Sequence, residues 1–205
     1  MSKMLEDAEA VFSELVPDRD ELLLALEREA GEEGIPIAGP LVGHLLYILV
    51  RATGARKILE LGTATGYSAV FLGRAAAEHG GRVVTVERDP DMAARAGHNL
   101  LEAGLAGRVE IVTGEADDLL PRMEPGFDMA FLDIDKEGYA PALLHCARLV
   151  RGGGLLVADN TAFSAAEDFS RAVAGTENWH AVNLHCFLPG HSPEYDGLCI
   201  ALRTP

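Results

Sequence analysis

The chain has 205 residues, of which 48% are hydrophobic and 24% are charged, so its length and composition suit one globular domain. Its formal net charge is −15, and a surface this acidic repels phosphate backbones, which disfavours nucleic acid as a partner. No apolar run is long enough to cross a bilayer, and the polar, acidic start lacks the basic and apolar regions of a signal peptide. We therefore expect a cytoplasmic location and no membrane partner.

The three cysteines, Cys146, Cys186 and Cys199, are odd in number and include no CxxC pair. This pattern argues against a disulfide framework and against a zinc site built from cysteines. We interpret all three as small buried hydrophobic residues.

The first third of the sequence predicts three helices. Apolar residues recur at helical spacing over 5–15, a second helix capped by Asp18 or Asp20 is expected to run to about residue 30, and a third covers 41–52. The segment 35–40 contains two prolines and a glycine, and it predicts an irregular connector between the second and third helices.

From residue 57 onward, short apolar runs alternate with amphipathic stretches. The runs cover 57–61, 82–86, 109–112, 129–132 and 155–158, and the helix candidates cover 68–78, 90–103, 117–123, 139–150 and 165–174. This alternation predicts a parallel sheet with helices on both faces. Two last runs, at 180–188 and 198–202, have only a loop between them and predict an antiparallel pair at the edge of the sheet.

The first predicted strand leads into a loop that contains Gly62 and Gly66. In open α/β sheets, ligands bind beyond the carboxyl ends of the strands, and glycines let the backbone approach a ligand closely. The spacing GxxxG lacks the middle glycine of a dinucleotide fingerprint, and the loop lacks the GK[ST] of a P-loop. The alternative interpretation is a tight turn that binds nothing.

The second predicted strand ends at Glu87, where a carboxylate can accept hydrogen bonds from both ribose hydroxyls. The alternative is a surface acid beside Arg88. Together with the glycine loop, Glu87 favours a cofactor that contains a nucleoside. The third strand ends before Glu115, Ala116 and Asp117, where we expect an adenine edge in contact with the backbone of Ala116 and with one of the two acids.

The fourth and fifth predicted strands end in Asp133 and in Asp159 and Asn160, and parallel strands bring their carboxyl ends to one edge. Three such oxygens suit a hard divalent cation, which prefers oxygen ligands. The alternative is that the acids cap the helices that follow. Lys136, one of only three lysines, is placed to accept a proton from a substrate hydroxyl, and its alternative role is an ion pair with Asp135.

These motifs together resemble the metal-dependent S-adenosylmethionine O-methyltransferases, a family that includes the catechol and caffeoyl-CoA O-methyltransferases and small bacterial and archaeal relatives. The matching segments are ILELGTATGYSAV, VERDP, FLDIDK, VADN and DGLCIALR. The resemblance implies an α/β fold of the Rossmann-like class I methyltransferase type, with a mostly parallel seven-stranded sheet and an antiparallel edge strand. It also implies a homodimer, in which the N-terminal helices of residues 1–53 cover the acceptor site or form the dimer interface.

The resemblance further implies roles for the matching residues. S-adenosylmethionine would be bound by Glu60, Gly62, Thr63, Gly66, Tyr67, Ser68, Glu87, Glu115, Ala116 and Asp133. A divalent cation, Mg²⁺ or else Mn²⁺ or Ca²⁺, would be bound by Asp133, Asp159 and Asn160, and Lys136 would be the catalytic base. The cation would hold an acceptor hydroxyl and a neighbouring oxygen, and the oxyanion would attack the sulfonium methyl in one displacement.

The acceptor expected from this mechanism is a small, catechol-like molecule with vicinal oxygens. Two alternatives stay open: a tRNA hydroxyuridine O-methyltransferase, which the segment REAGEEGIPIAGPLVGHLLYIL resembles and the net charge disfavours, and a non-catalytic module that binds the cofactor. The segments 161–176 and 188–196 depart from the family pattern, and His185, His191 and Glu194 in the C-terminal region receive no role.

Overall fold

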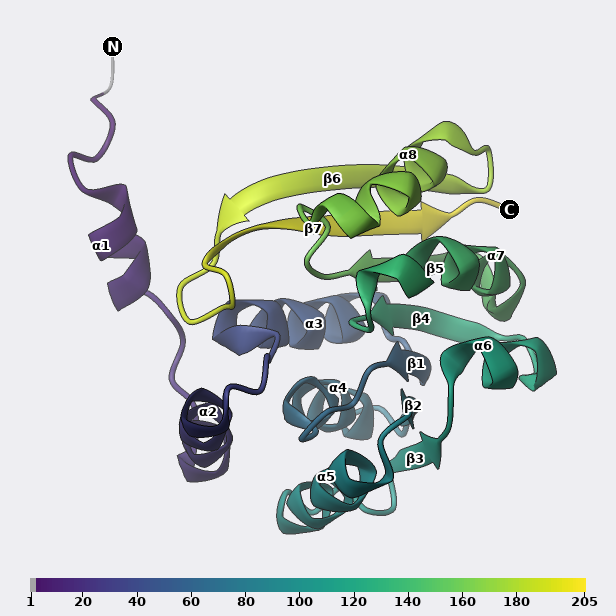
Figure 1. Cartoon of the computed structure of the whole chain (residues 1–205), viewed down its shortest axis with the longest axis horizontal. Helices are drawn as coiled ribbons and strands as arrows, with labels where there is room; N and C mark the ends of the chain where they lie inside the picture. The colour runs from purple at the N-terminus through teal and green to yellow at the C-terminus, as the bar shows by residue number, and fades with distance from the viewer. Residues whose placement is uncertain (1–2) are drawn as a thin grey trace.

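Three helices precede the first strand in the computed structural model, which describes residues 3–205 (Figure 1). α1 (Ala8–Glu14) begins behind Asp7, whose carboxylate accepts a hydrogen bond from the Ala10 amide, and none of its residues is buried. α2 (Glu21–Glu33) is capped by Asp20, one of the two predicted caps. α3 (Gly39–Thr53) is longer than the predicted 41–52 and ends at Gly54 in the left-handed conformation.

Strands and helices then alternate as the hydrophobic pattern predicts. The strands are β1 (Lys57–Leu61), β2 (Arg82–Glu87), β3 (Val109–Thr113), β4 (Phe127–Leu132), β5 (Val150–Ala158), β6 (Trp179–Phe187) and β7 (Tyr195–Arg203). The helices between them are α4 (Tyr67–Ala77), α5 (Pro90–Glu102), α6 (Ala116–Leu119), α7 (Tyr139–Leu149) and α8 (Glu167–Gly175).

The seven strands form one sheet in the order β3-β2-β1-β4-β5-β7-β6. The first five pair in parallel, whereas β7 pairs antiparallel with both β5 and β6. The predicted antiparallel pair therefore lies at this edge of the sheet, with β7 inserted between β5 and β6. β1 and β4 are parallel neighbours in the sheet, although β2 and β3 lie between them in the sequence. The loops that follow β1 and β4 therefore meet at the carboxyl edge of the sheet.

The two faces of the sheet are covered by different helices, as Figure 1 shows. Ile58 of β1 packs with apolar residues of α2, α3 and α4, whereas Leu59 and Leu61 pack with those of α7 and α8. Successive strand residues point to opposite faces, so both faces of β1 are buried, and an uninterrupted apolar run is what such a strand requires.

Three details differ from the sequence prediction. β5 begins at Val150, well before the predicted residue 155. The helix expected over 117–123 is split into α6 and a separate 3₁₀ turn, Leu120–Arg122, because Pro121 has no amide hydrogen to continue the helix. Cys146 and Cys199 are buried as expected, but Cys186 is only half-buried, since it lies on the edge strand β6. No helix between residues 3 and 205 is long and apolar enough to cross a membrane.

Candidate functional site

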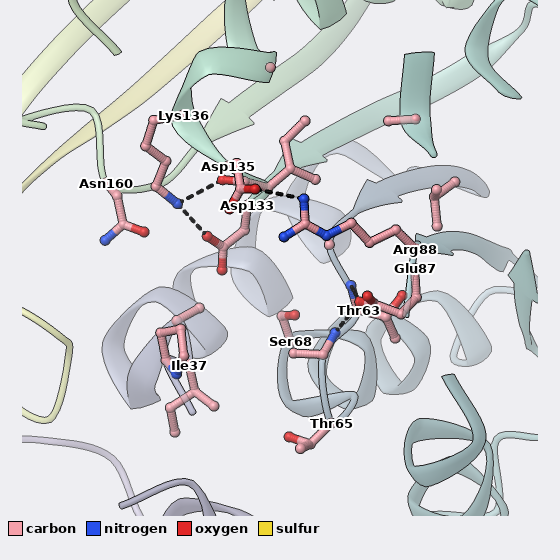
Figure 2. Close-up of a pocket in the computed structure, with 18 of the residues that line it drawn as sticks. Ile37, Thr63, Thr65, Ser68, Glu87, Arg88, Asp133, Asp135, Lys136 and Asn160 are labelled. Atoms are coloured by element: carbon pink, nitrogen blue, oxygen red, sulfur yellow. Dashed lines mark hydrogen bonds and ion pairs between the residues drawn. The ribbon is translucent and has the colours of Figure 1, made fainter. Parts of the chain in front are cut away.

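A cavity of about 370 Å³ opens at the carboxyl ends of β1, β2, β3 and β4, where the sequence places the cofactor (Figure 2). Ten of the predicted site residues line it: Gly62, Thr63, Tyr67, Ser68, Glu87, Glu115, Ala116, Asp133, Lys136 and Asn160. Three other predicted residues, Glu60, Gly66 and Asp159, lie behind this wall and do not line the cavity.

The loop from β1 to α4 owes its shape to its two glycines. Gly62 and Gly66 have φ angles of 93° and 90°, which residues with a side chain rarely adopt. A Cβ atom on Gly62 would lie 2.0 Å from the carbonyl oxygen of Asp133, so the loop passes directly against the end of β4. Gly66 ends the loop, and α4 begins at Tyr67 without a side-chain cap; its first two residues, Tyr67 and Ser68, line the cavity.

Glu87 fixes this loop from the end of β2. Its Oε2 accepts hydrogen bonds from the Thr63 and Ala64 amides at 3.1 and 2.8 Å, and its Oε1 accepts one from the Asp89 amide at 3.0 Å. The side chain is 9% exposed and lines the cavity, so the alternative of a surface acid beside Arg88 is wrong. Arg88 instead donates to Asp135 at 2.7 Å, which joins the ends of β2 and β4 across the cavity (Figure 2).

Glu60 is a fully buried acid at the end of β1, directly before the glycine loop. Neither of its carboxylate oxygens makes a hydrogen bond of regular geometry with a described residue, although the nearby Ser68 and Thr85 hydroxyls act to lower its pKa. Burial, as the main cause, raises its pKa to about 7, because a low-dielectric surrounding disfavours the charged form. A buried acid without a partner is costly for the protein and marks a place where a cationic ligand group would be stabilised.

The N-terminal helices are joined to this site through Tyr67. Its hydroxyl donates to Glu27 of α2 at 2.6 Å, and Arg19 donates to both oxygens of the same carboxylate at 3.0 and 3.2 Å. The connector between α2 and α3 contributes Pro36, Ile37 and Ala38 to the cavity wall. The sequence identified this connector only as irregular, because three small or apolar residues carry no chemical signal.

Lys136 and Asp133 form the wall of the cavity after β4. The Lys136 Nζ donates to Asp133 Oδ1 and to the Ile134 carbonyl, both at 3.0 Å, and Asn160 lies beside it in Figure 2. The alternative that Lys136 pairs with Asp135 is wrong, since Asp135 pairs with Arg88. Burial raises the pKa of Asp133, and the nearby Lys136 ammonium acts in the opposite direction.

Asp159 and Asn160 follow β5; Asp159 is contacted by the loop between β6 and β7, and Asn160 by the start of β7. The His191 Nε2 lies 3.1 and 3.0 Å from the two carboxylate oxygens of Asp159. The Asn160 side-chain amide donates to Asp196 at 2.7 Å. Burial acts to lower the pKa of His191, but the hydrogen bond and the charge of Asp159 outweigh burial, so that its pKa is raised.

Sequence reasoning missed His191, to which it gave no role. A single histidine in a loop rich in proline and glycine carries no spacing signal, and only the fold brings it to Asp159 from 32 residues away. Among residues 3–205, no three side chains of the histidine, cysteine, aspartate and glutamate types form a group that could hold a metal ion.

The fold and this cavity are those of an enzyme that binds a nucleoside-containing cofactor at the carboxyl edge of a parallel sheet. The profile of a family described as O-methyltransferase matches residues 19–171. The catechol O-methyltransferase of Niastella koreensis is 40% identical over 165 residues, which cover 78% of this chain and 74% of that protein. The catechol O-methyltransferase of Mycobacterium tuberculosis is 37% identical over 171 residues, which cover 78% of this chain and 77% of that protein.

Solved structures agree with this assignment. The O-methyltransferase of Bacillus cereus in complex with SAH has a TM-score of 0.85 at 29% identity, with 96% of each chain covered. TomG of Streptomyces achromogenes, an O-methyltransferase solved with SAM, has a TM-score of 0.85 at 30% identity, with 98% of this chain and 100% of that chain covered. The chain belongs to the O-methyltransferase family and is an S-adenosylmethionine-dependent O-methyltransferase.

Proposed function

We propose that this enzyme methylates a hydroxyl group of a small, catechol-like acceptor, with Lys136 as the group that accepts the hydroxyl proton. The observation that carries the proposal is the position of the Lys136 Nζ on the cavity wall, beside Asp133 and at the opposite end from Glu87 (Figure 2). The curated relatives in Niastella and Mycobacterium, which are named for catechol, support the choice of acceptor.

The glycine loop and its neighbours fit S-adenosylmethionine. Gly62, which packs on the Asp133 carbonyl and also lines the cavity, sets the loop beside the space for the cofactor, and the buried Glu60 carboxylate makes no regular hydrogen bond with a described residue. We assign Glu60, Gly62, Thr63, Gly66, Tyr67, Ser68 and Asp133 to the methionine part, Glu87 to the ribose, and Glu115 and Ala116 to the adenine. An amino group of the cofactor near Glu60 would be stabilised by this carboxylate.

The reaction proposed for this site is a single displacement. When bound, the cofactor would supply a methyl group carried on a positively charged sulfur. The acceptor hydroxyl would receive that methyl group on its oxygen and would give its proton to the Lys136 Nζ, after the Lys136 ammonium has itself released a proton to solvent. Lys136 and Asn160 would hold the acceptor oxygen, and Ile37 and Ala38 of the connector would pack against its apolar part.

The predicted divalent cation remains a prediction, and the three proposed ligands as arranged do not fit it. Asp159 is fully buried and does not line the cavity, and both of its oxygens face His191. The Lys136 side chain forms an ion pair with Asp133, the remaining proposed ligand. A hydrated cation that enters from the cavity would reach Asn160 and Asp133 but not Asp159, so we assign no step of the reaction to it.

The substitution Lys136→Ala tests the proposal. We expect the rate of catechol methylation to fall roughly 10²- to 10⁴-fold, the usual contribution of a general base, with the dissociation constant for S-adenosylmethionine unchanged. Lys57→Ala is the matched control, because Lys57 lies at the amino end of β1 and contacts the carbonyls of Glu124 and Pro125. Unchanged turnover in Lys136→Ala would remove Lys136 from this role, and a failure of catechols to react in the parent enzyme would refute the acceptor class.

The other expectations from the sequence remain predictions. A homodimer is consistent with the exposed apolar residues Leu5, Phe12 and Leu15 on and around α1. The cytoplasmic location also remains a prediction. No feature of the site favours tRNA or a purely binding role, because Lys136 faces an open cavity beside the cofactor cradle.

A further inference from the structure

Glu27 is an acid on the face of α2 that packs against the core. The buried residues of this helix are Leu23, Leu26 and Ala30, and Glu27 lies four residues after the first and three before the last, on the same side of the helix. Its side chain is 20% exposed. A carboxylate at such a position is costly unless other groups pair with it, so its partners decide what it contributes.

Glu27 has two partners, from different parts of the chain. Arg19, directly before the cap of α2, donates to both carboxylate oxygens, at 3.0 and 3.2 Å, which fixes the orientation of the carboxylate. The Tyr67 hydroxyl donates to Oε1 at 2.6 Å. Tyr67 is the first residue of α4 and lines the cavity. Glu27 is thus a point at which the N-terminal region holds a residue of the cofactor site.

Tyr67 is itself fixed on two sides. Its side chain is buried, and its ring packs edge-to-face on Phe71, with the ring centroids 5.4 Å apart. Burial, as the main cause, and the hydrogen bond to Glu27 raise the pKa of the hydroxyl, so that it keeps its proton and stays the donor. A buried hydroxyl that loses its acceptor is costly, and this cost opposes any movement of α2 away from α4.

Resting on the function proposed above, which assigns Tyr67 to the cofactor, we propose that Glu27 is a positioning residue that couples α2 to the bound cofactor. Through the Tyr67 hydroxyl, binding of the cofactor against α4 would also stabilise α2 and the cavity wall that follows α2 in the chain.

The end of α2 sets the position of this wall. The helix ends at Glu33, and the Ile35 amide donates to the Ala30 carbonyl at 2.9 Å, which ties the start of the connector to the last turn. The next three residues, 36–38, line the cavity. Figure 1 shows α2 next to α4, with the connector leading from α2 to α3. A shift of α2 would therefore move the wall that we assign to the acceptor.

Two other polar links join α2 to the core, and both are more exposed. Asp20 and Glu33 form ion pairs with arginines of α4 and α5, at 2.5 and 2.7 Å, and the two acids are 49% and 50% exposed. Exposed pairs contribute little to stability and are weakened by salt. Of these three links, the hydrogen bond between Tyr67 and Glu27 is the one that reaches the cavity wall.

Hydrogen exchange of backbone amides, read by mass spectrometry, tests the coupling without any turnover. The probe is S-adenosylhomocysteine (SAH), which has no methyl group to transfer. In the parent we expect SAH to slow exchange roughly fivefold or more both in residues 62–70 and in residues 23–38. In Tyr67→Phe, which keeps the ring and loses the hydroxyl, the effect should persist in 62–70 and fall below about twofold in 23–38.

Variants of Glu27 separate this coupling from a direct contact between the Tyr67 hydroxyl and the cofactor. Glu27→Ala leaves Tyr67 intact and should still lose the protection of 23–38, whereas Glu27→Gln, whose amide oxygen can accept from Tyr67, should retain it. If Glu27→Ala does not fold, Glu27→Leu, which suits the apolar face of α2, replaces it. Tyr47→Phe is the matched control, because it removes a hydrogen bond from a tyrosine to Glu78, at the end of α4, and should behave as the parent.

Coupling between two sites is reciprocal, so the same variants should change the affinity for SAH. We expect the dissociation constant, measured by calorimetry, to rise roughly threefold to tenfold in Tyr67→Phe and Glu27→Ala, the effect of one hydrogen bond to a charged group. In Glu27→Gln and Tyr47→Phe it should change less than about twofold.

Three results would overturn the inference. Absence of protection of 23–38 in the SAH-bound parent would show that α2 is independent of the cofactor. Protection as large in Glu27→Ala as in the parent would show that Glu27 does not carry the coupling, and an equal loss in Glu27→Gln and Glu27→Ala would show that the hydrogen bond from Tyr67 does not. Failure of the proposed function is recognised separately, by a parent that shows the protection but methylates no catechol.

Discussion

Glu87 shows how one side chain can serve both the fold and the ligand. Its carboxylate orders the glycine loop through the amides of Thr63 and Ala64, and the same carboxylate lies on the cavity wall. Hydrogen bonds from amides to a charged acceptor are stronger than those between neutral groups, so Glu87 keeps the loop in the shape that the cofactor needs.

The substitution Glu87→Gln should therefore weaken S-adenosylmethionine binding by roughly tenfold to a hundredfold, the equivalent of one or two hydrogen bonds to a charged group. The dissociation constant is measured by calorimetry at neutral pH. Glu110→Gln, at an exposed position on the neighbouring strand β3, is the control and should bind as the parent does. Equal affinity in both variants would contradict the role given to Glu87.

Glu60 gives the cofactor-free enzyme a pH-dependent stability. Its pKa is raised from the ordinary 4.5 to about 7 in the folded protein, mainly by burial, so the folded state binds this proton more tightly than the unfolded chain does. The contribution of Glu60 to the free energy of unfolding is therefore largest at low pH and is lost as the pH rises from about 4.5 to about 7.

Glu60→Gln should remove this dependence. Between pH 4.5 and pH 7.5, the free energy of unfolding of the variant should rise relative to that of the parent by up to about 3 kcal/mol. Chemical denaturation without cofactor measures this difference. Glu102→Gln, at an exposed position near the end of α5, should show no such gain. If the difference between Glu60→Gln and the parent does not change with pH, the buried acid does not titrate in this range.

At the residue scale, the sequence predicted which residues lie at the site better than it predicted their hydrogen-bond and ion-pair partners. A strand followed by a glycine, an acid or a lysine is enough to predict that Gly62, Glu87, Asp133 and Lys136 lie at one edge of the sheet. The partner of Lys136 and the approach of His191 to Asp159 depend on loop geometry, which no periodic pattern encodes.

The glycine loop and β4 form a unit at the scale of secondary-structure elements. The close approach of Gly62 to the Asp133 carbonyl links the loop that cradles the cofactor to the strand that carries Asp133 and precedes Lys136. A displacement of either element would therefore move the two halves of the site together.

Gly62→Ala should separate these two elements. Its Cβ atom would lie 2.0 Å from the Asp133 oxygen, so we expect a loss of roughly 3 kcal/mol or more in stability and the loss of measurable cofactor binding. Gly80→Ala is the matched control, since Gly80 also has a positive φ, of 77°, but has no atom within 4 Å of the added Cβ. The control should cost only about 1 kcal/mol, by thermal or chemical denaturation. Similar losses in both variants would mean that backbone conformation, and not the contact with β4, matters.

The elements themselves were predictable where the hydrophobic period was clear. The first four strands and the helices α4, α5 and α7 lie within two residues of their predicted bounds, because buried parallel strands and amphipathic helices have distinct apolar patterns. β5 begins earlier than predicted, at Val150, because its first half contains three consecutive glycines and has no apolar run. The segment around Pro121 and the packing of the 188–194 loop on α3 were not predictable, since one depends on a single missing amide and the other on a contact between distant glycines.

At the scale of the whole molecule, the net charge of −15 favours a small acceptor over an RNA acceptor. Binding to RNA requires basic groups that replace counterions along the phosphate backbone, and this protein has 32 acids against 17 lysines and arginines. The acidic surface leaves a small neutral acceptor free to approach the cavity.

Unmodified tRNA transcripts should accordingly show no binding, even at low ionic strength. Fluorescence anisotropy of a labelled transcript measures this, with S-adenosylmethionine present so that the cofactor site is filled. Saturable binding that weakens steeply as salt is added would indicate a local basic surface and would support the tRNA alternative.

The place of β7 within the sheet has a consequence for the synthesis of the protein. β7 follows β6 in the chain, yet it lies between β5 and β6 in the sheet. Until Tyr195–Arg203 has left the ribosome, β5 is therefore paired only with β4, and β6 has no neighbour in this sheet. Until then a nascent chain carries the exposed edge of β5 and an isolated β6, and unpaired edges are the places where chains associate wrongly. The methyl-transfer site, whose Asp159 and Asn160 are held by the β6–β7 region, would thus be completed only after β7 has been synthesised.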